Sequence, residues 1–188
     1  MAVTAVLLAG GESRRMGRDK ATLVWRGRPL WEWQIEKLRK LCPKKILVSA
    51  KSDLPWRPAD VDPVLDVTPS RGPLSGLAAA LACTESEYLL ALAVDMPFMT
   101  VSQLRNLCEL ATSGTGVIPV IDGRPEPIAA VYPREAREKF LEALHSTDFS
   151  LQPIVEKLIA VGMLGAAPIS GPARDLYKSI NEPGDLDY

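Results

Sequence analysis

Apolar and polar positions along this chain fall into alternating blocks that predict short strands separated by helices. Short runs with almost no charge are typical of strands buried on both faces of a parallel sheet. Between these runs, apolar residues recur every three or four positions, which predicts helices with one buried face. The predicted strands cover residues 3–8, 46–48, 64–67, 88–94 and 117–121. The predicted helices cover residues 29–42, 74–83, 104–111, 136–144 and 151–158.

The order of these elements predicts the fold class. Strand and helix alternate over the first two-thirds of the chain, as in an open, mostly parallel α/β sheet with helices on both faces. We therefore expect a three-layer, Rossmann-like fold. Asp122 and Gly123 predict a hairpin turn leading to a partner strand over residues 127–132, and a late strand is expected over residues 176–180. No repeat, low-complexity segment or linker interrupts the pattern, so residues 1–188 are expected to form one domain.

Composition narrows the classes of partner. With 188 residues, of which 47% are hydrophobic, the chain can bury a full core. Its net charge of −1 disfavours binding to nucleic acid or to an anionic membrane surface, and no uncharged run is long enough to span a bilayer. The three cysteines lack C-x-x-C spacing and are odd in number, which argues against disulfides or a zinc site. We expect a cytoplasmic protein whose cysteines are buried free thiols.

One stretch concentrates positive charge against this nearly neutral background. Residues 7–20 read LLAGGESRRMGRDK, with three glycines and four cations after the first predicted strand. Glycine lets backbone N–H groups approach a phosphate closely, and successive N–H groups form an anion-binding nest. Arginine and lysine side chains neutralise the remaining charge. The stretch therefore predicts a phosphate-binding loop; the alternative is a solvated turn rich in arginine and lysine.

Polar residues at the ends of other predicted strands belong to the same edge of the sheet. Ser49 follows the second strand, Asp66 lies in the third, the segment TPSRGPLSG comes next, and Asp95 ends the run at 88–94. Ligands bind at the carboxyl ends of strands in such sheets, so we expect these residues to form one site. Asp95 is a candidate Mg²⁺ ligand, because proteins commonly hold Mg²⁺ with one or two carboxylates plus substrate phosphates. The alternative for Asp95 is a helix N-cap or a hydrogen bond within its loop.

The sequence disfavours several other chemistries. Its one histidine, His145, lies at a predicted helix end, so neither a Ser-His-Asp triad nor a histidine-rich metal site is expected. The first loop lacks the G-x-G-x-x-G pattern, and Ala21 follows Lys20 where a Walker loop needs serine or threonine. What remains is phosphoryl-type transfer between bound substrates, which depends on positioning and charge neutralisation.

Four segments resemble the signature of the MobA-like nucleotidyltransferase family: LLAGGESRRMGRDK, RGPLSGL, AVDMPF and SINEPGDL. Their order and spacing hold across nearly the whole chain. The resemblance implies an enzyme that transfers GMP from Mg-GTP to a molybdopterin-type molybdenum cofactor and releases pyrophosphate, with Mg²⁺ as its cofactor. The resemblance also suggests molybdoenzyme apo-proteins or insertion chaperones as candidate partners that would receive the product cofactor. The related cytidylyltransferases typically carry LAAG where this chain has LAGG, which favours GTP over CTP.

The resemblance also implies roles for individual residues. Lys20 would bind the phosphates, the metal would lie on Asp95, and Asn181 would contact the acceptor. The nucleotide would be bound by Leu8, Ala9, Gly10, Gly11, Lys20, Ser49, Asp66, Gly72 and Asp95. Independently of the resemblance, Arg15 offers a planar guanidinium fork for a phosphate, so the predicted catalytic residues are Arg15, Lys20 and Asp95. The rival interpretations are a nucleotidyltransferase for another base or acceptor, such as a cytidylyltransferase or a sugar-phosphate enzyme, and a non-catalytic nucleotide-binding accessory protein.

Overall fold

The computed structural model describes residues 2–10, 19–52 and 54–180, and its centre is a mixed β-sheet. The strands of this sheet are β1 (Val3–Leu8), β4 (Lys45–Ala50), β5 (Asp62–Leu65), β6 (Tyr88–Ala93), β7 (Gly116–Ile121), β8 (Arg124–Pro125), β9 (Val131–Pro133) and β10 (Leu164–Ile169). Among the described residues they are ordered β10-β7-β9-β6-β1-β4-β5, with β8 paired to β7. The first strand of the chain is therefore central, between β4 and β6.

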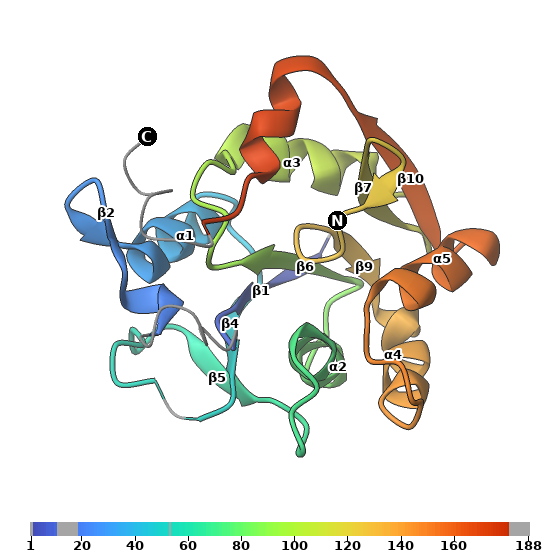
Figure 1. Cartoon of the computed structure of the whole chain (residues 1–188), viewed down its shortest axis with the longest axis horizontal. Coiled ribbons are helices and arrows are strands. Elements are labelled where there is room, and N and C mark those ends of the chain that lie inside the picture. Colours follow the sequence, from blue (N-terminus) through green and yellow to red (C-terminus); the bar gives the residue numbers. More distant parts are fainter. Residues whose placement is uncertain (1, 11–18, 53, 181–188) are drawn as a thin grey trace.

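Helices cover both faces of this sheet, as the sequence predicts (Figure 1). They are α1 (Leu30–Arg39), α2 (Pro73–Ala82), α3 (Val101–Leu110), α4 (Arg137–Ala143) and α5 (Gln152–Ala160). Side chains of α1 and α3 pack against one face, and those of α2, α4 and α5 against the other. Alternate residues of β1 divide between these layers, with Leu7 in the first and Val6 in the second. The three-layer α/β prediction is confirmed.

Short elements complete the fold. They are the hairpin strands β2 (Val24–Trp25) and β3 (Arg28–Pro29), and the 3-10 helices η1 (Lys20–Thr22), η2 (Arg134–Ala136) and η3 (Gly171–Tyr177). Within the described part of the chain, no helix is long and apolar enough to cross a membrane.

Four parallel strands define the edge of the sheet that matters for function. β1 pairs parallel with both β4 and β6, and β4 pairs parallel with β5. The carboxyl ends of these strands therefore lie side by side. On the other side of β6 the direction changes, because β9 runs antiparallel to both β6 and β7.

The hairpin after β7 is confirmed at its turn and wrong in its second strand. Asp122 and Gly123 both have positive φ, 50° and 77°, as a two-residue hairpin turn requires. Arg124 and Pro125 pair back onto β7 as the short strand β8. β9 covers only residues 131–133, and it pairs over three residues with β6 but at one position, Val131 with Val117, with β7. Pro125 and Pro127 lack an N–H for a ladder, which explains why the hairpin ends early.

The predicted late strand over residues 176–180 is wrong. That region begins within η3, and the last strand of the described residues is β10, which pairs parallel with β7 at the end of the sheet. β10 reads LGAAPI, so small residues and a proline replace the apolar run that marks a buried strand. An edge strand tolerates both, because one side of its backbone needs no partner strand.

The expectation of three buried thiols is also wrong. Cys42 and Cys83 are exposed, and only Cys108 is partly buried. Cys42 follows the end of α1 with a positive φ of 52°, and Cys83 is the C-cap of α2. Both lie past the last turn of their helix, where the apolar period no longer predicts burial.

Candidate functional site

A pocket opens where β1, β4 and β6 end, at the edge of the sheet that the sequence predicts. Ala9 is buried beside this pocket, and its N–H donates to the Ser49 carbonyl over 2.9 Å. The predicted residues Gly11, Arg15 and Asn181 lie outside the described residues. The other predicted residues all line the pocket: Leu8, Gly10, Lys20, Ser49, Asp66, Gly72 and Asp95. Segments far apart in the sequence thus meet in one place.

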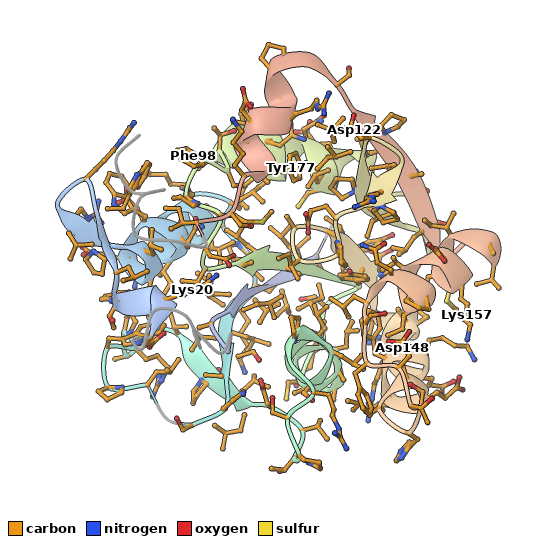
Figure 2. All side chains as sticks on the ribbon, in the orientation of Figure 1. Lys20, Phe98, Asp122, Asp148, Lys157 and Tyr177 are labelled. Carbon is orange, nitrogen blue, oxygen red and sulfur yellow. The ribbon has the colours of Figure 1, made fainter. Side chains whose placement is uncertain are left out.

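Lys20 and Asp95 form an ion pair inside this pocket. The Lys20 Nζ lies 2.8 Å from Asp95 Oδ2, and the two side chains are only 16% and 18% exposed. Asp19 caps η1, because its carboxylate accepts a hydrogen bond from the Ala21 N–H and another from Trp56 Nε1. These two bonds fix the start of η1, so Lys20 is directed toward Asp95. Figure 2 shows Lys20 between η1 and the ends of the central strands.

The two carboxylate oxygens of Asp95 differ in their hydrogen bonding. Oδ2 accepts from Lys20, whereas Oδ1 is buried and has no hydrogen-bond partner among the described residues. A buried carboxylate oxygen without a partner is unfavourable, and a bound cation would satisfy it. Thr100 caps α3 by accepting from the Gln103 N–H, so Asp95 is not the helix cap that the sequence left open. The carboxylate chemistry therefore fits the predicted Mg²⁺ site.

Ser49 and Asp66 form a second polar pair on the opposite wall of the pocket. The Ser49 hydroxyl donates to Asp66 Oδ1 over 2.8 Å, and the Ser70 hydroxyl donates to Asp66 Oδ2 over 2.9 Å. Ser49 is 2% exposed and Asp66 8% exposed. Each carboxylate oxygen can accept more than one bond, so Asp66 keeps acceptor capacity toward the pocket. A Cβ at Gly10 would lie 3.2 Å from Asp66 Oδ2, which explains the glycine at this position.

The second glycine loop turns sharply into α2. Gly72 has φ 66° and ψ −145°, a conformation that side chains disfavour, and Pro73 opens the helix at its first turn. The Ser75 hydroxyl accepts from the Arg71 N–H over 2.8 Å and so closes the loop onto the helix. Gly72 and Pro73 line the pocket, so the N-terminal end of α2 faces the ligand space, where its dipole favours an anion.

Glu126 is a partly buried carboxyl close enough to Asp95 for the two charges to interact. Burial raises the pKa of the Glu126 carboxyl, and the negative charge of Asp95 adds to that rise. The Asp95 carboxylate therefore acts on a neighbouring carboxyl that does not itself line the pocket.

Two α1 residues that the sequence did not indicate contact the loop carrying Asp95. Gln34 is fully buried and donates to loop carbonyls, and Lys37 donates to the Pro97 carbonyl. The available signal was a glutamine on an apolar helix face, one turn from both Leu30 and Leu38. A polar residue at such a position needs buried partners, but the sequence does not name them.

Comparisons with known proteins agree with this geometry. The MobA-like NTP transferase domain matches residues 5–161 of the chain. A probable molybdenum cofactor guanylyltransferase of Opitutus terrae is 33% identical over 190 residues, covering 99% of this chain and 94% of the relative. The molybdenum cofactor guanylyltransferase of Cereibacter sphaeroides is 32% identical over 191 residues, with the same 99% and 94% covered.

Solved structures share the fold. Molybdopterin-guanine dinucleotide biosynthesis protein A from Archaeoglobus fulgidus matches with a TM-score of 0.77 and 24% identity, over 97% of this chain and 94% of that one. The 2-C-methyl-D-erythritol 4-phosphate cytidylyltransferase of Thermus thermophilus matches with a TM-score of 0.69 and 19% identity, over 96% and 94%. Proteins of this fold are thus named for different nucleotide bases, guanine in one case and cytosine in the other. The fold alone does not identify the base, so the residues of the pocket must.

Proposed function

This chain belongs to the MobA-like NTP transferase family, and we propose that it transfers GMP from GTP to a molybdopterin-type molybdenum cofactor with release of pyrophosphate. The observation that carries the proposal is the Lys20–Asp95 pair in the pocket at the carboxyl ends of the central strands. This pocket offers a cation, the N-terminal end of a helix and a carboxylate oxygen that has no hydrogen-bond partner in the part of the chain that the structure describes. These groups suit a nucleoside triphosphate better than an uncharged ligand.

The reaction forms one bond and breaks one bond at the α-phosphorus of GTP. An oxygen of the acceptor's terminal phosphate attacks this phosphorus. The bond to the oxygen bridging the α- and β-phosphates breaks, and pyrophosphate leaves with that electron pair. A phosphate nucleophile is largely ionised near neutral pH, so no protein base is required. The Lys20 ammonium would contact phosphate oxygens and offset the negative charge that develops during transfer.

We propose Mg²⁺ as the cofactor and Asp95 as its protein ligand. When bound, Mg²⁺ supplies further neutralisation of the triphosphate charge. The ion pair with Lys20 holds the Asp95 carboxylate in place and leaves Oδ1 for the cation. An ammonium group has three donors, so Lys20 can keep its bond to Asp95 while it binds a phosphate oxygen.

Asp66 supports guanine as the preferred base. Its carboxylate only accepts hydrogen bonds, and the Watson–Crick edge of guanine presents neighbouring N–H donors. The Ser49 and Ser70 hydroxyls orient both carboxylate oxygens beside the pocket. The names of the relatives from Opitutus terrae and Cereibacter sphaeroides support the same base and acceptor.

The test removes the charge of Lys20 and keeps its aliphatic stem. Lys20→Met should reduce pyrophosphate release from Mg-GTP and the molybdopterin-type acceptor by about 10²–10³-fold, the usual loss for one charge-stabilising donor. Lys45→Met is the matched control, because Lys45 also pairs with an aspartate, Asp62 Oδ2 at 2.7 Å, but at the amino end of β4. The control should keep full turnover.

Different outcomes identify the rival functions. Unchanged turnover in folded Lys20→Met would remove Lys20 from the site. Turnover with CTP in place of GTP would identify a cytidylyltransferase, and turnover with a sugar phosphate would identify another acceptor. Binding of GTP without turnover by the wild-type protein would identify a nucleotide-binding accessory protein.

We extend the proposal to the organisation and location of the enzyme. Residues 1–188 would act as one catalytic domain, and the free thiols Cys42, Cys83 and Cys108 are typical of the reducing cytoplasm. Delivery of the product to a molybdoenzyme apo-protein or an insertion chaperone stays a prediction.

A further inference from the structure

Gln34 places a side-chain amide among backbone carbonyls at the end of β6. It lies in α1, is 0% exposed, and its Nε2 donates to the carbonyl oxygens of Ala93, Val94 and Met96 at 3.2, 3.3 and 2.8 Å. Two amide hydrogens serve these three acceptors, so one of the bonds is shared. The three carbonyls flank Asp95 on both sides.

Lys37, one turn further along α1, extends this contact. Its ammonium donates to Gln34 Oε1 over 2.9 Å and to the Pro97 carbonyl over 2.6 Å. The Asp95 carbonyl accepts from the Ile180 N–H over 2.8 Å. Every carbonyl from residue 93 to residue 97 therefore has a hydrogen-bond partner, and α1 supplies a partner for four of the five.

We propose that Gln34 and Lys37 form a clamp on residues 93–97 that sets the position of the Asp95 carboxylate in the pocket. Neither side chain lines the pocket, so both are positioning residues. The part of the inference that concerns Mg²⁺ and GTP rests on the proposed function. The part that concerns the fixed geometry of residues 93–97 is independent of that function.

The chemistry of the clamp differs from that of ordinary core packing. The same face of α1 buries Leu30, Ile35 and Leu38, and an apolar side chain in place of Gln34 would continue that face. A buried amide instead needs all its bonds satisfied, and a partly buried ammonium is desolvated. Burial accordingly lowers the pKa of Lys37 to about 8. The arrangement fits a requirement for a fixed loop beside a metal ligand, because groups that orient ligands determine metal affinity.

The test compares Gln34→Met with a control that loses a buried hydrogen bond elsewhere. Thr4→Val removes the 2.9 Å hydrogen bond between the Thr4 and Ser86 hydroxyls. This bond lies near the amino ends of β1 and β6, away from the pocket. The first readout is backbone amide hydrogen exchange over residues 93–96 and at Ile180 in the ligand-free protein. The second is the Mg²⁺ concentration that gives half-maximal GMP transfer.

Gln34→Met should speed exchange over residues 93–96. It should also raise the half-maximal Mg²⁺ concentration or lower the rate by about 10–100-fold, as for other residues that orient metal ligands. Thr4→Val should change neither, even at equal loss of thermal stability. Lys37→Met provides a second variant if Gln34→Met does not fold, because Lys37 is only partly buried. It should give the same pattern with a smaller amplitude.

If exchange over residues 93–96 in Gln34→Met equals that in Thr4→Val, the clamp is overturned. Provided that the wild-type enzyme turns over GTP, the clamp is also overturned if Gln34→Met leaves both the half-maximal Mg²⁺ concentration and the rate unchanged. If the wild-type protein fails to turn over GTP at all, the proposed function is wrong. The hydrogen-exchange comparison still decides the clamp in that case.

Discussion

Gly76→Ala adds one methyl group where α2 crosses β4 at the pocket wall, and its effect on stability follows from the local distances. The new Cβ would lie 2.5 Å from Ser49 Oγ, 3.3 Å from Asp66 Oδ1 and 3.4 Å from Ser49 Cβ. The first distance is far below van der Waals contact. The Ser49 hydroxyl must therefore move, and its bond to Asp66 Oδ1 breaks.

The magnitude is a balance of opposing terms. Replacing glycine by alanine inside a helix stabilises it by about 1 kcal/mol. Overpacking a well-filled site destabilises by about 1–3 kcal/mol, and a buried hydrogen bond contributes about 1 kcal/mol. We expect a net loss of about 2 kcal/mol, which corresponds to about 4–8 °C in Tm for a protein of this size. Urea denaturation and thermal unfolding measure both quantities.

A double-mutant cycle tests the assigned cause. In a Ser49→Ala background the clashing oxygen is absent, so Gly76→Ala should be close to neutral or stabilising. The coupling energy between the two substitutions should then be about 2–3 kcal/mol, within the range for residues in contact. Equal effects of Gly76→Ala in both backgrounds, within about 0.5 kcal/mol, would refute the reasoning.

Two further predictions concern titratable groups. Because burial lowers the pKa of Lys37 from 10.5 to about 8, the folded protein binds fewer protons than the unfolded chain between these values. The free energy of unfolding should therefore rise across that window by up to about 3 kcal/mol, and Lys37→Met should flatten the rise in denaturation curves. Burial also raises the pKa of the Cys108 thiol to about 11, whereas Cys42 and Cys83 are exposed. A thiol reagent at pH 8 should label those two quickly and Cys108 slowly; equally fast labelling of all three in peptide maps would contradict this.

The strands around the pocket were predictable because they are buried on both faces. Residues 3–8 and 88–94 contain little except apolar residues, and the structure places them side by side as β1 and β6. Once such runs are assigned to parallel strands, their carboxyl ends must meet, so the residues that follow them meet as well. This is why Asp66 and Asp95 could be assigned to one site from sequence order alone.

The missed features share a different physical origin. β10 lies at the sheet edge and consists mainly of small residues, so it carries no apolar run that marks a strand. β9 pairs mainly with β6 and at only one position with β7, and such long-range pairing leaves no local trace. The contacts of Gln34 depend on which loop happens to cross α1, which a helical period cannot specify.

The central place of β1 has a consequence for synthesis of the protein. Leu8 pairs with Ala93, a separation of 85 residues, so β1 lacks its second neighbour until that part of the chain has been made. At about 5–20 residues per second, translation of this interval takes about 4–17 s. During that time an apolar segment with an open edge is exposed at the ribosome, a state prone to aggregation. We expect the yield of folded protein to follow the capacity of chaperones that shield nascent chains, more than the stability of the finished fold.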